Sequence, residues 1–325
     1  MVTMSVPRPR TPVAIDSVFD DPSVVSDLVD AHQPYWPVQR YMANGAEYAT
    51  LSGDTSPTTG IVVAPVFRGD WAVRDQVEDG VDRVLHHEPF LHAARTVFDA
   101  EIVRPHTVYA NLTWQLPFAQ GRGHVDIPAF RGFDRTTVPV AFLTIMGLSG
   151  LFETERVKVA TAVAWFYDGA DGGFEYWPDG PAGPSVVHEG GIGNTAIVAD
   201  NDFMWHRVRP LGLVEDGMVS LDLESELRHT GDGLWSIVDG DGSTVASFER
   251  DRLRVSISWK GDVFFDDEDL RRHEQHLDDI DQAEVIARFV ADLDERGISV
   301  VVPEEPLRDP SFLSVLQAAY MHYPT

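Results

Sequence analysis

Residues 203–210 and 253–259, FMWHRVRP and LRVSISW, decide the fold, because each is a short apolar, β-branched and aromatic run between turn-forming residues. Gly, Asp and Pro separate further runs of this kind from residue 101 onward. They occupy residues 101–114, 138–146, 157–167, 193–200, 234–240 and 243–250. Many short strands at this spacing are typical of an all-β barrel or jelly roll. The sequence therefore predicts a mainly β core.

Segments with apolar residues at helical spacing precede and follow this core in the sequence. We expect a strand at 60–68 and helices at 16–33, at 73–99 with a break near Pro89, at 266–296 ending at Gly297, and at about 309–320. The chain is thus expected to form an N-terminal support region (1–100), a β core (101–265) with an inserted hairpin (213–250) and C-terminal helices (266–325). With no repeat and no long linker, these regions are predicted to pack as one structural domain.

The composition excludes several classes of function. The net charge is -27, and a surface this acidic repels phosphate backbones and anionic headgroups, so neither nucleic acid nor membrane is an expected partner. The chain has no cysteine, which excludes disulfides, thiolate nucleophiles and Cys-based metal sites. There is neither a secretory signal nor an apolar run long enough to span a bilayer. We expect a cytoplasmic protein that holds any metal through His and carboxylate side chains.

Three residues form a candidate metal site. His124 and Asp126 are two positions apart in GRGHVDIPAF, so in a strand both side chains face the same way. His206 follows an apolar run 82 residues later (206 − 124), a separation that suits two distant strands of one barrel. Two imidazoles and one carboxylate on one face make the facial triad of oxygen-activating iron(II) sites, with three adjacent positions left open.

A candidate anion site lies on the last strand of the core. Alternation places Arg254, Ser256 and Ser258 on one face of this strand and the apolar residues between them on the other. A guanidinium inside a small barrel is costly unless it meets an anion, and a carboxylate is its natural bidentate partner. Two alternatives remain open at this point: pairing of Arg254 with a nearby Asp, and the use of Arg252, which has the same parity.

With these motifs in order, the chain resembles the Fe(II)/2-oxoglutarate-dependent dioxygenase superfamily, in its prolyl-hydroxylase-like and small-molecule branches. Residues 166–175 (FYDGADGGFE) and 193–198 (GNTAIV) look like other landmarks of that family, and the resemblance covers about residues 106–260. One departure is the gap of 48 residues (254 − 206) between distal His and Arg, where many members have about ten; residues 213–250 fill it.

The resemblance implies a double-stranded β-helix (jelly roll, cupin-like) core. It implies iron ligation by His124, Asp126 and His206, and binding of the distal carboxylate of 2-oxoglutarate by Arg254 with Ser256. The implied cofactors are Fe(2+), 2-oxoglutarate and O2, with ascorbate as a stimulant. The implied reaction converts 2-oxoglutarate to succinate and CO2 while a second substrate is oxidised. Members that halogenate typically lack the carboxylate that Asp126 supplies, which favours hydroxylation, desaturation or ring closure.

Four further residues are candidates on weaker grounds. Tyr109 and Asn111 share one strand face and could contact the oxoacid. Arg131 could meet a substrate carboxylate, and Trp165 could line the substrate pocket. In each case ordinary packing is the alternative.

The predicted function is oxidation of a small molecule, amino-acid-like or a natural-product intermediate, because Arg131 and Arg207 are spare cations near the motifs. A homodimer is possible. The alternatives are a 2-oxoglutarate-independent metal enzyme of the cupin type and a non-catalytic binding protein on the same fold.

Overall fold

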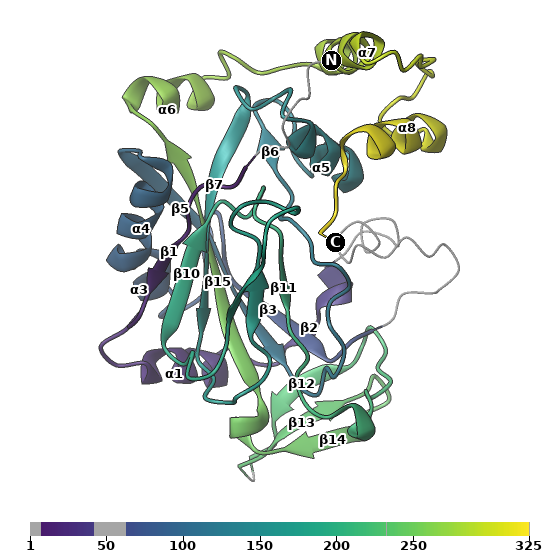
Figure 1. Cartoon of the computed structure of the whole chain (residues 1–325). Helices are drawn as coiled ribbons and strands as arrows, with labels where there is room; N and C mark the ends of the chain where they lie inside the picture. The colour runs from purple at the N-terminus through teal and green to yellow at the C-terminus, as the bar shows by residue number, and fades with distance from the viewer. Residues whose placement is uncertain (1–7, 42–62, 232, 325) are drawn as a thin grey trace.

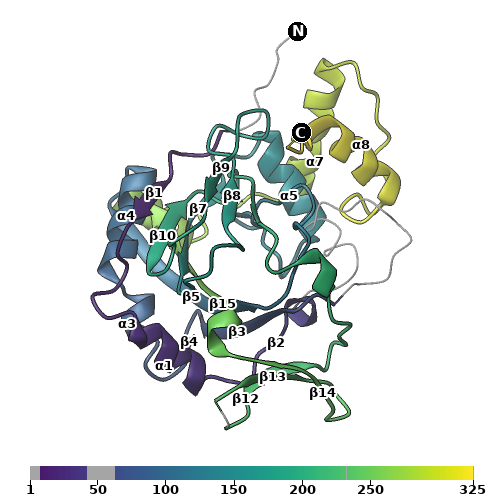
Figure 2. The ribbon, with the colours of Figure 1, turned by 60° about the horizontal axis from the view of Figure 1, so that its bottom comes forward.

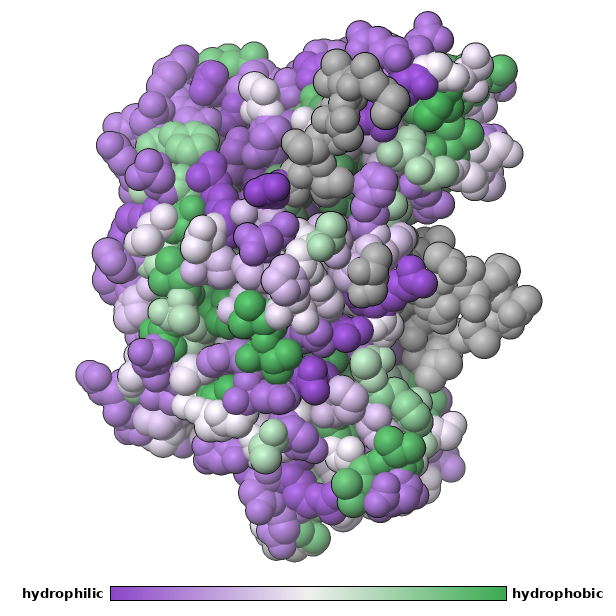
Figure 3. Space-filling model, viewed as in Figure 1, coloured by the Kyte–Doolittle hydropathy of each residue, from purple (hydrophilic) through white to green (hydrophobic). Residues whose placement is uncertain are grey.

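Two facing β-sheets form the centre of the molecule, and helices cover its outer side and one end (Figures 1 and 2). The computed structural model describes residues 8–41, 63–231 and 233–324. The fold is mainly β with antiparallel sheets and with helices at both ends of the chain. No helix among these residues is long and apolar enough to cross a membrane. On the face shown in Figure 3, polar residues predominate and apolar ones are scattered.

The larger sheet has nine strands in the order β1-β10-β7-β15-β5-β3-β2, with β4 paired to β3 and β6 paired to β7. These strands are β1 (Val13–Ile15), β2 (Trp36–Pro37), β3 (Val66–Val73), β4 (Gln76–Val77), β5 (Ile102–Thr113), β6 (Ala129–Phe130), β7 (Arg156–Trp165), β10 (Thr195–Ala199) and β15 (Arg254–Phe264). The long strand β15 lies between β5 and β7 and is antiparallel to both. The inward-facing side chains of these three strands therefore form one continuous surface.

The smaller sheet has the order β11-β8-β9, made by β8 (Phe174–Tyr176), β9 (Val186–His188) and β11 (His206–Val208). An antiparallel bridge between His124 and His206 adds the segment around residue 124 to its edge. Along the chain, the path alternates between the sheets: β5, the 124 segment, β7, β8 and β9, β10, β11, and finally β15. This alternation winds a double-stranded β-helix, so the predicted jelly roll is confirmed.

Helices α1 (Ser23–Ala31), α3 (Asp82–Leu85) and α4 (Glu88–Phe98) cover the outer face of the large sheet. Val255, Ile257 and Trp259 of β15 belong to the buried cluster beneath them, and the Trp259 indole donates to the backbone carbonyl of Leu85 at 2.7 Å. The predicted alternation of β15 is therefore correct, and its even-numbered residues face the inside of the barrel.

A second core joins α5 (Val140–Ser149), α7 (Gln282–Glu295) and α8 (Pro310–Tyr320) at one end of the barrel. The prediction of a strand at 138–146 is wrong, because this segment forms α5. Almost the whole helix is buried, so it is apolar on all sides and carries no 3.6-residue pattern that would distinguish it from a buried strand. Its tertiary surroundings decided its conformation.

The insertion between β11 and β15 is larger than the predicted hairpin. It forms a three-stranded sheet of β12 (Glu226–His229), β13 (Trp235–Val238) and β14 (Thr244–Phe248), with 3-10 helices η2 (Val214–Asp216) and η3 (Arg250–Arg252) on either side. A bridge between Tyr35 and Leu227 ties this sheet to the N-terminal region. The turn between β13 and β14 was predictable, whereas β12 carries too weak an apolar pattern to be recognised.

Other predicted boundaries shift by as many as nine residues: the helix predicted from residue 73 begins only at Asp82, after the short strand β4. The helix predicted at 16–33 begins only at Ser23. Residues 60–62 of the predicted strand lie outside the described residues, and β3 runs on to Val73. Pro89 lies in the first turn of α4 instead of breaking it, as a proline at that position can. The helix predicted at 266–296 is two helices, α6 (Asp267–Glu274) and α7.

Candidate metal centre and inner polar face

His124, Asp126 and His206 meet at one point between the two sheets. Each of the three residues offers one potential ligand atom, and these three atoms all lie within 4.8 Å of one another. In the described part of the chain, this is the one group of three or more His, Asp or Glu residues that could hold a metal ion. Backbone bonds in both directions between residues 124 and 206 hold the two histidines side by side, with ring centroids 4.3 Å apart. The Asp126 amide donates to the Asn201 carbonyl at 2.8 Å. The local sheet geometry thus brings residues 82 apart into one cluster.

The ring of His206 has a defined orientation. Its Nδ1 lies 2.9 Å from the carbonyl oxygen of Met204, and its Nε2 lies 3.8 Å from Oδ1 of Asp126. A proton on Nδ1 donated to that carbonyl leaves the lone pair of Nε2 free for a metal, as is common for ligating histidines. The donor set of two imidazoles and one carboxylate fits a divalent iron of the facial-triad type.

The protonation states of the three side chains suit metal binding. The pKa of His124 is lowered to about 3, chiefly by burial and also by the neighbouring His206, against the opposing effect of Asp126. Burial also lowers the pKa of His206. For Asp126, burial favours the neutral acid, but the ammonium of Lys260 and the ring of His206 outweigh it and hold the pKa below its usual range. At neutral pH the site therefore offers two neutral imidazoles and a carboxylate.

The inner face of β15 carries a row of polar side chains from one end of the barrel to the other. Ser256 lies opposite Asn111 of β5 and Trp165 of β7, and Ser258 lies opposite Tyr109. The Asn111 amide nitrogen is 3.4 Å from the Ser258 hydroxyl. The structure therefore places Tyr109, Asn111, Ser256 and Trp165 on the one inner surface that also carries Arg254; we call this surface the inner polar face.

Arg254 lies at the deep end of the inner polar face. The Arg254 side chain is 1% exposed; its Nε donates to the Gly172 carbonyl at 2.5 Å, and Nη1 lies 3.3 Å from the Ser256 hydroxyl. Gly172 in turn donates to the carbonyl of Pro210, four residues beyond His206, so the guanidinium is displaced from the metal ligands along the strands. Within residues 8–41, 63–231 and 233–324 no carboxylate forms an ion pair with it, and burial lowers its pKa to about 10.

A buried guanidinium without an anion is unusual in a chain of net charge -27. The alternative that a nearby Asp neutralises Arg254 therefore does not hold for the described residues. Arg252 is not on the strand at all: it belongs to η3 and is exposed, because the chain turns into β15 only after Leu253. Of the two arginines considered from the sequence, Arg254 alone is inside the barrel.

Arg131 lies elsewhere. Its guanidinium is 5% exposed and forms ion pairs with Asp269 of α6 and with Asp278. Both pairs join the barrel to the C-terminal helices, so Arg131 has no free charge to offer a substrate. Trp165 is buried against Phe174, which in turn contacts the ring of His206 with centroids 5.5 Å apart.

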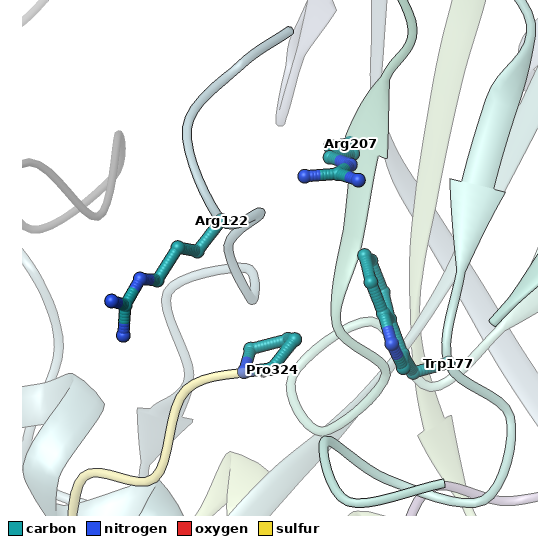
Figure 4. Close-up of a pocket in the computed structure, with 4 residues that line it drawn as sticks. All are labelled: Arg122, Trp177, Arg207 and Pro324. Carbon is teal, nitrogen blue, oxygen red and sulfur yellow. The ribbon is translucent and has the colours of Figure 1, made fainter. Parts of the chain in front are cut away.

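Arg207 also faces away from the metal. Because His206 points into the barrel, its neighbour points outward, where it pairs with Glu175 at 2.8 Å and lies over the ring of Trp177 at 5.4 Å. Arg207 and Trp177, together with Arg122 and Pro324, line a pocket of about 310 Å³ on the outer side of the small sheet (Figure 4). This pocket is separate from the metal centre.

Sequence reasoning missed Lys260 and Thr161. Lys260 forms an ion pair with Oδ2 of Asp126, and the Thr161 hydroxyl donates to the same oxygen at 3.1 Å. Lys260 has the parity of Arg254, Ser256 and Ser258, so the alternation along β15 could have placed it on the inner polar face. Nothing in the sequence could show which residue of the inner polar face lies beside the metal ligands.

Comparisons with known proteins give fold likeness only. No known family model matches the sequence, and no curated protein matches it. The solved structures that resemble the chain are 2-oxoglutarate/Fe(II) oxygenases. An oxidoreductase of this family from Burkholderia pseudomallei is 13% identical, covers 78% of this chain and 85% of its own, and has a TM-score of 0.41.

Two other oxygenases of this family illustrate the range of ligands. A prolyl hydroxylase from Trichoplax adhaerens, in complex with a peptide fragment of the hypoxia inducible factor oxygen degradation domain, is 8% identical over 82% of this chain and 87% of its own, with a TM-score of 0.40. HygX from Streptomyces hygroscopicus, with nickel, 2-oxoglutarate and hygromycin B bound, is 10% identical over 79% and 84%, with a TM-score of 0.37.

Proposed function

We propose that the protein is a non-haem Fe(II)/2-oxoglutarate-dependent oxygenase that hydroxylates, desaturates or cyclises a small molecule and releases succinate and CO2. One observation carries this proposal: a metal-binding triad on the small sheet and a buried guanidinium on the large sheet both lie inside the barrel, and among the described residues that guanidinium has no carboxylate partner. A metal enzyme that does not use an oxoacid has no need for that charge, so Arg254 weighs against the cupin-type alternative.

The chain's own residues have distinct tasks in this reaction. His124, Asp126 and His206 would hold iron, which supplies the oxygen chemistry when it is bound. Arg254 and Ser256 would bind the distal carboxylate of 2-oxoglutarate through charge-assisted hydrogen bonds. Tyr109 and Asn111, which lie opposite Ser258 and Ser256, would line the space between these two ends.

The small-molecule substrate stays a prediction from the sequence. The sequence-based argument for an amino-acid-like substrate rested on Arg131 and Arg207, and both are ion-paired away from the metal centre. The cytoplasmic location, a homodimer and stimulation by ascorbate stay predictions from the sequence.

A direct test measures ligand binding before activity. Purified protein is mixed without oxygen with Fe(II) and 2-oxoglutarate, and the visible charge-transfer band of a chelated oxoacid is recorded. Succinate formation is then followed across a panel of small molecules. We expect the band and succinate for the unmodified protein and neither for Asp126→Ala. A metal-loaded protein that shows no band and forms no succinate with any compound would contradict the proposal.

A further inference from the structure

The ammonium group of Lys260 sits on the metal-binding carboxylate. Lys260 is one of only two lysines among the chain's 25 cationic Lys and Arg residues; the other is Lys158. The Lys260 Nζ forms an ion pair with Oδ2 of Asp126 and lies 3.2 Å from the Thr161 hydroxyl. The two charged side chains are 19% and 16% exposed, so the pair is largely shielded from water.

The two oxygens of Asp126 consequently have different surroundings. Oδ2 forms the ion pair with Lys260 and accepts a hydrogen bond from the Thr161 hydroxyl, whereas Oδ1 lies 3.8 Å from Nε2 of His206. The carboxylate is thus held from behind by a cation and a hydroxyl. The metal-binding side of the cluster is left with one carboxylate oxygen and two imidazoles.

We propose that Lys260, supported by Thr161, is a positioning residue that restricts Asp126 to a single oxygen toward the metal; this inference rests on the proposed function. A carboxylate can bind a metal through one oxygen or through both. A facial triad with a one-oxygen carboxylate leaves three positions open. A chelating oxoacid needs two of these, so a carboxylate bound through both oxygens would compete with the oxoacid or with the remaining co-substrate.

The choice of lysine over arginine supports this role. The chain uses arginine for 23 of its 25 Lys and Arg positions (25 − 2), including the buried ion pairs of Arg131 and Arg156. A guanidinium binds both oxygens of a carboxylate with its planar fork, and would therefore take Oδ1 away from the metal. An ammonium is a compact point charge that can occupy Oδ2 alone.

The test compares four variants: Lys260→Met, Lys260→Arg, Thr161→Val and, as matched control, Lys158→Met. Lys158 is also a largely buried lysine; it lies on β7, where its Nζ donates to the Glu153 carbonyl at 3.1 Å, away from the triad. Mn²⁺ binding to the metal-free protein is followed by the loss of the free-ion electron paramagnetic resonance signal. Binding of 2-oxoglutarate to the Mn²⁺-loaded protein is followed by calorimetry.

We expect Lys260→Arg to weaken Mn²⁺ binding by about 10-fold or more, in the range typical of changes around metal ligands. Lys260→Met should keep Mn²⁺ affinity and weaken 2-oxoglutarate binding by about 10-fold or more. Part of that loss comes from the missing charge, so Thr161→Val, which leaves the charge in place, should show a smaller loss of 2-oxoglutarate affinity in the same direction. Lys158→Met should bind both ligands as the unmodified protein does.

Two results would overturn the inference: Mn²⁺ affinity of Lys260→Arg equal to that of the unmodified protein, or 2-oxoglutarate affinity unchanged in Thr161→Val. Circular dichroism identifies variants that fail to fold. If Lys260→Arg or Thr161→Val does not fold, the other of the two still tests the role of Lys260. If the unmodified protein itself binds neither Mn²⁺ nor 2-oxoglutarate, the proposed function fails. If it binds both while the variants match it, only the role of Lys260 fails.

Discussion

Replacing Arg254 with methionine should separate ligand binding from folding stability. Burial lowers the pKa of Arg254 from its usual value to about 10, so at neutral pH, below both values, the charged side chain destabilises the ligand-free fold by about 3 kcal/mol. Methionine removes this penalty but also removes the hydrogen bonds to Gly172 and Ser256, each worth about 1 kcal/mol. The ligand-free variant should therefore be about as stable as the unmodified protein, or about 1 kcal/mol more stable.

Ligand binding should change far more. Loss of one partner of a buried charge pair costs about 2–5 kcal/mol, so the affinity for 2-oxoglutarate should fall roughly 30-fold or more. At a ligand concentration of about 100 times the dissociation constant, 2-oxoglutarate should stabilise the unmodified protein by about 2.7 kcal/mol. The same concentration should stabilise the variant by at most about 0.9 kcal/mol. Urea denaturation of the Mn²⁺-loaded protein with and without 2-oxoglutarate measures both quantities.

Arg156→Met is the matched control. Arg156 is as buried as Arg254, but it pairs with Asp200 and Asp202 at 2.9 Å each and with Glu153 at 2.7 Å. Its loss leaves buried carboxylates unpaired, so we expect a loss of about 3–5 kcal/mol in stability. The reasoning is refuted if Arg254→Met loses as much stability as Arg156→Met and still binds 2-oxoglutarate normally.

Three further predictions concern the metal site and the second core. Asp126→Ala should abolish Mn²⁺ binding, as followed by electron paramagnetic resonance; retained tight binding would disprove the assigned ligand set. Burial lowers the pKa of His124 to about 3, so the unfolded chain binds a proton there below about pH 6.5 that the folded protein does not. As the pH is lowered from about 6 to about 5, the free energy of unfolding should therefore fall more steeply in the unmodified protein than in His124→Gln, by roughly 1 kcal/mol per pH unit. Urea denaturation measures both slopes. Equal slopes in the two proteins would count against a neutral buried imidazole. Phe142→Ala, in the fully buried helix α5, should cost about 3–5 kcal/mol of unfolding free energy, whereas a loss below about 1 kcal/mol would place Phe142 outside a packed core.

The sequence by itself identified most of the side chains of the candidate site. The His-x-Asp spacing of residues 124 and 126, a distant His206 and the alternation of β15 follow from strand geometry, because a period of two places these side chains on predictable faces. The β core and the flanking helices could be predicted for the same reason. The local signals for turns and caps were strong enough to give most element types, although boundaries moved by several residues.

The tertiary structure alone decided three things. It placed Lys260 and Thr161 at the level of Asp126, because the register between β15 and β7 is set by packing and not by any local pattern. It made residues 140–149 a helix, because a fully buried segment has no amphipathic period from which its conformation could be predicted. It also gave Arg131 its carboxylates on and beside α6 and, in the described part of the chain, left Arg254 without a carboxylate partner, since ion pairs between residues more than 100 positions apart depend on how the whole chain packs.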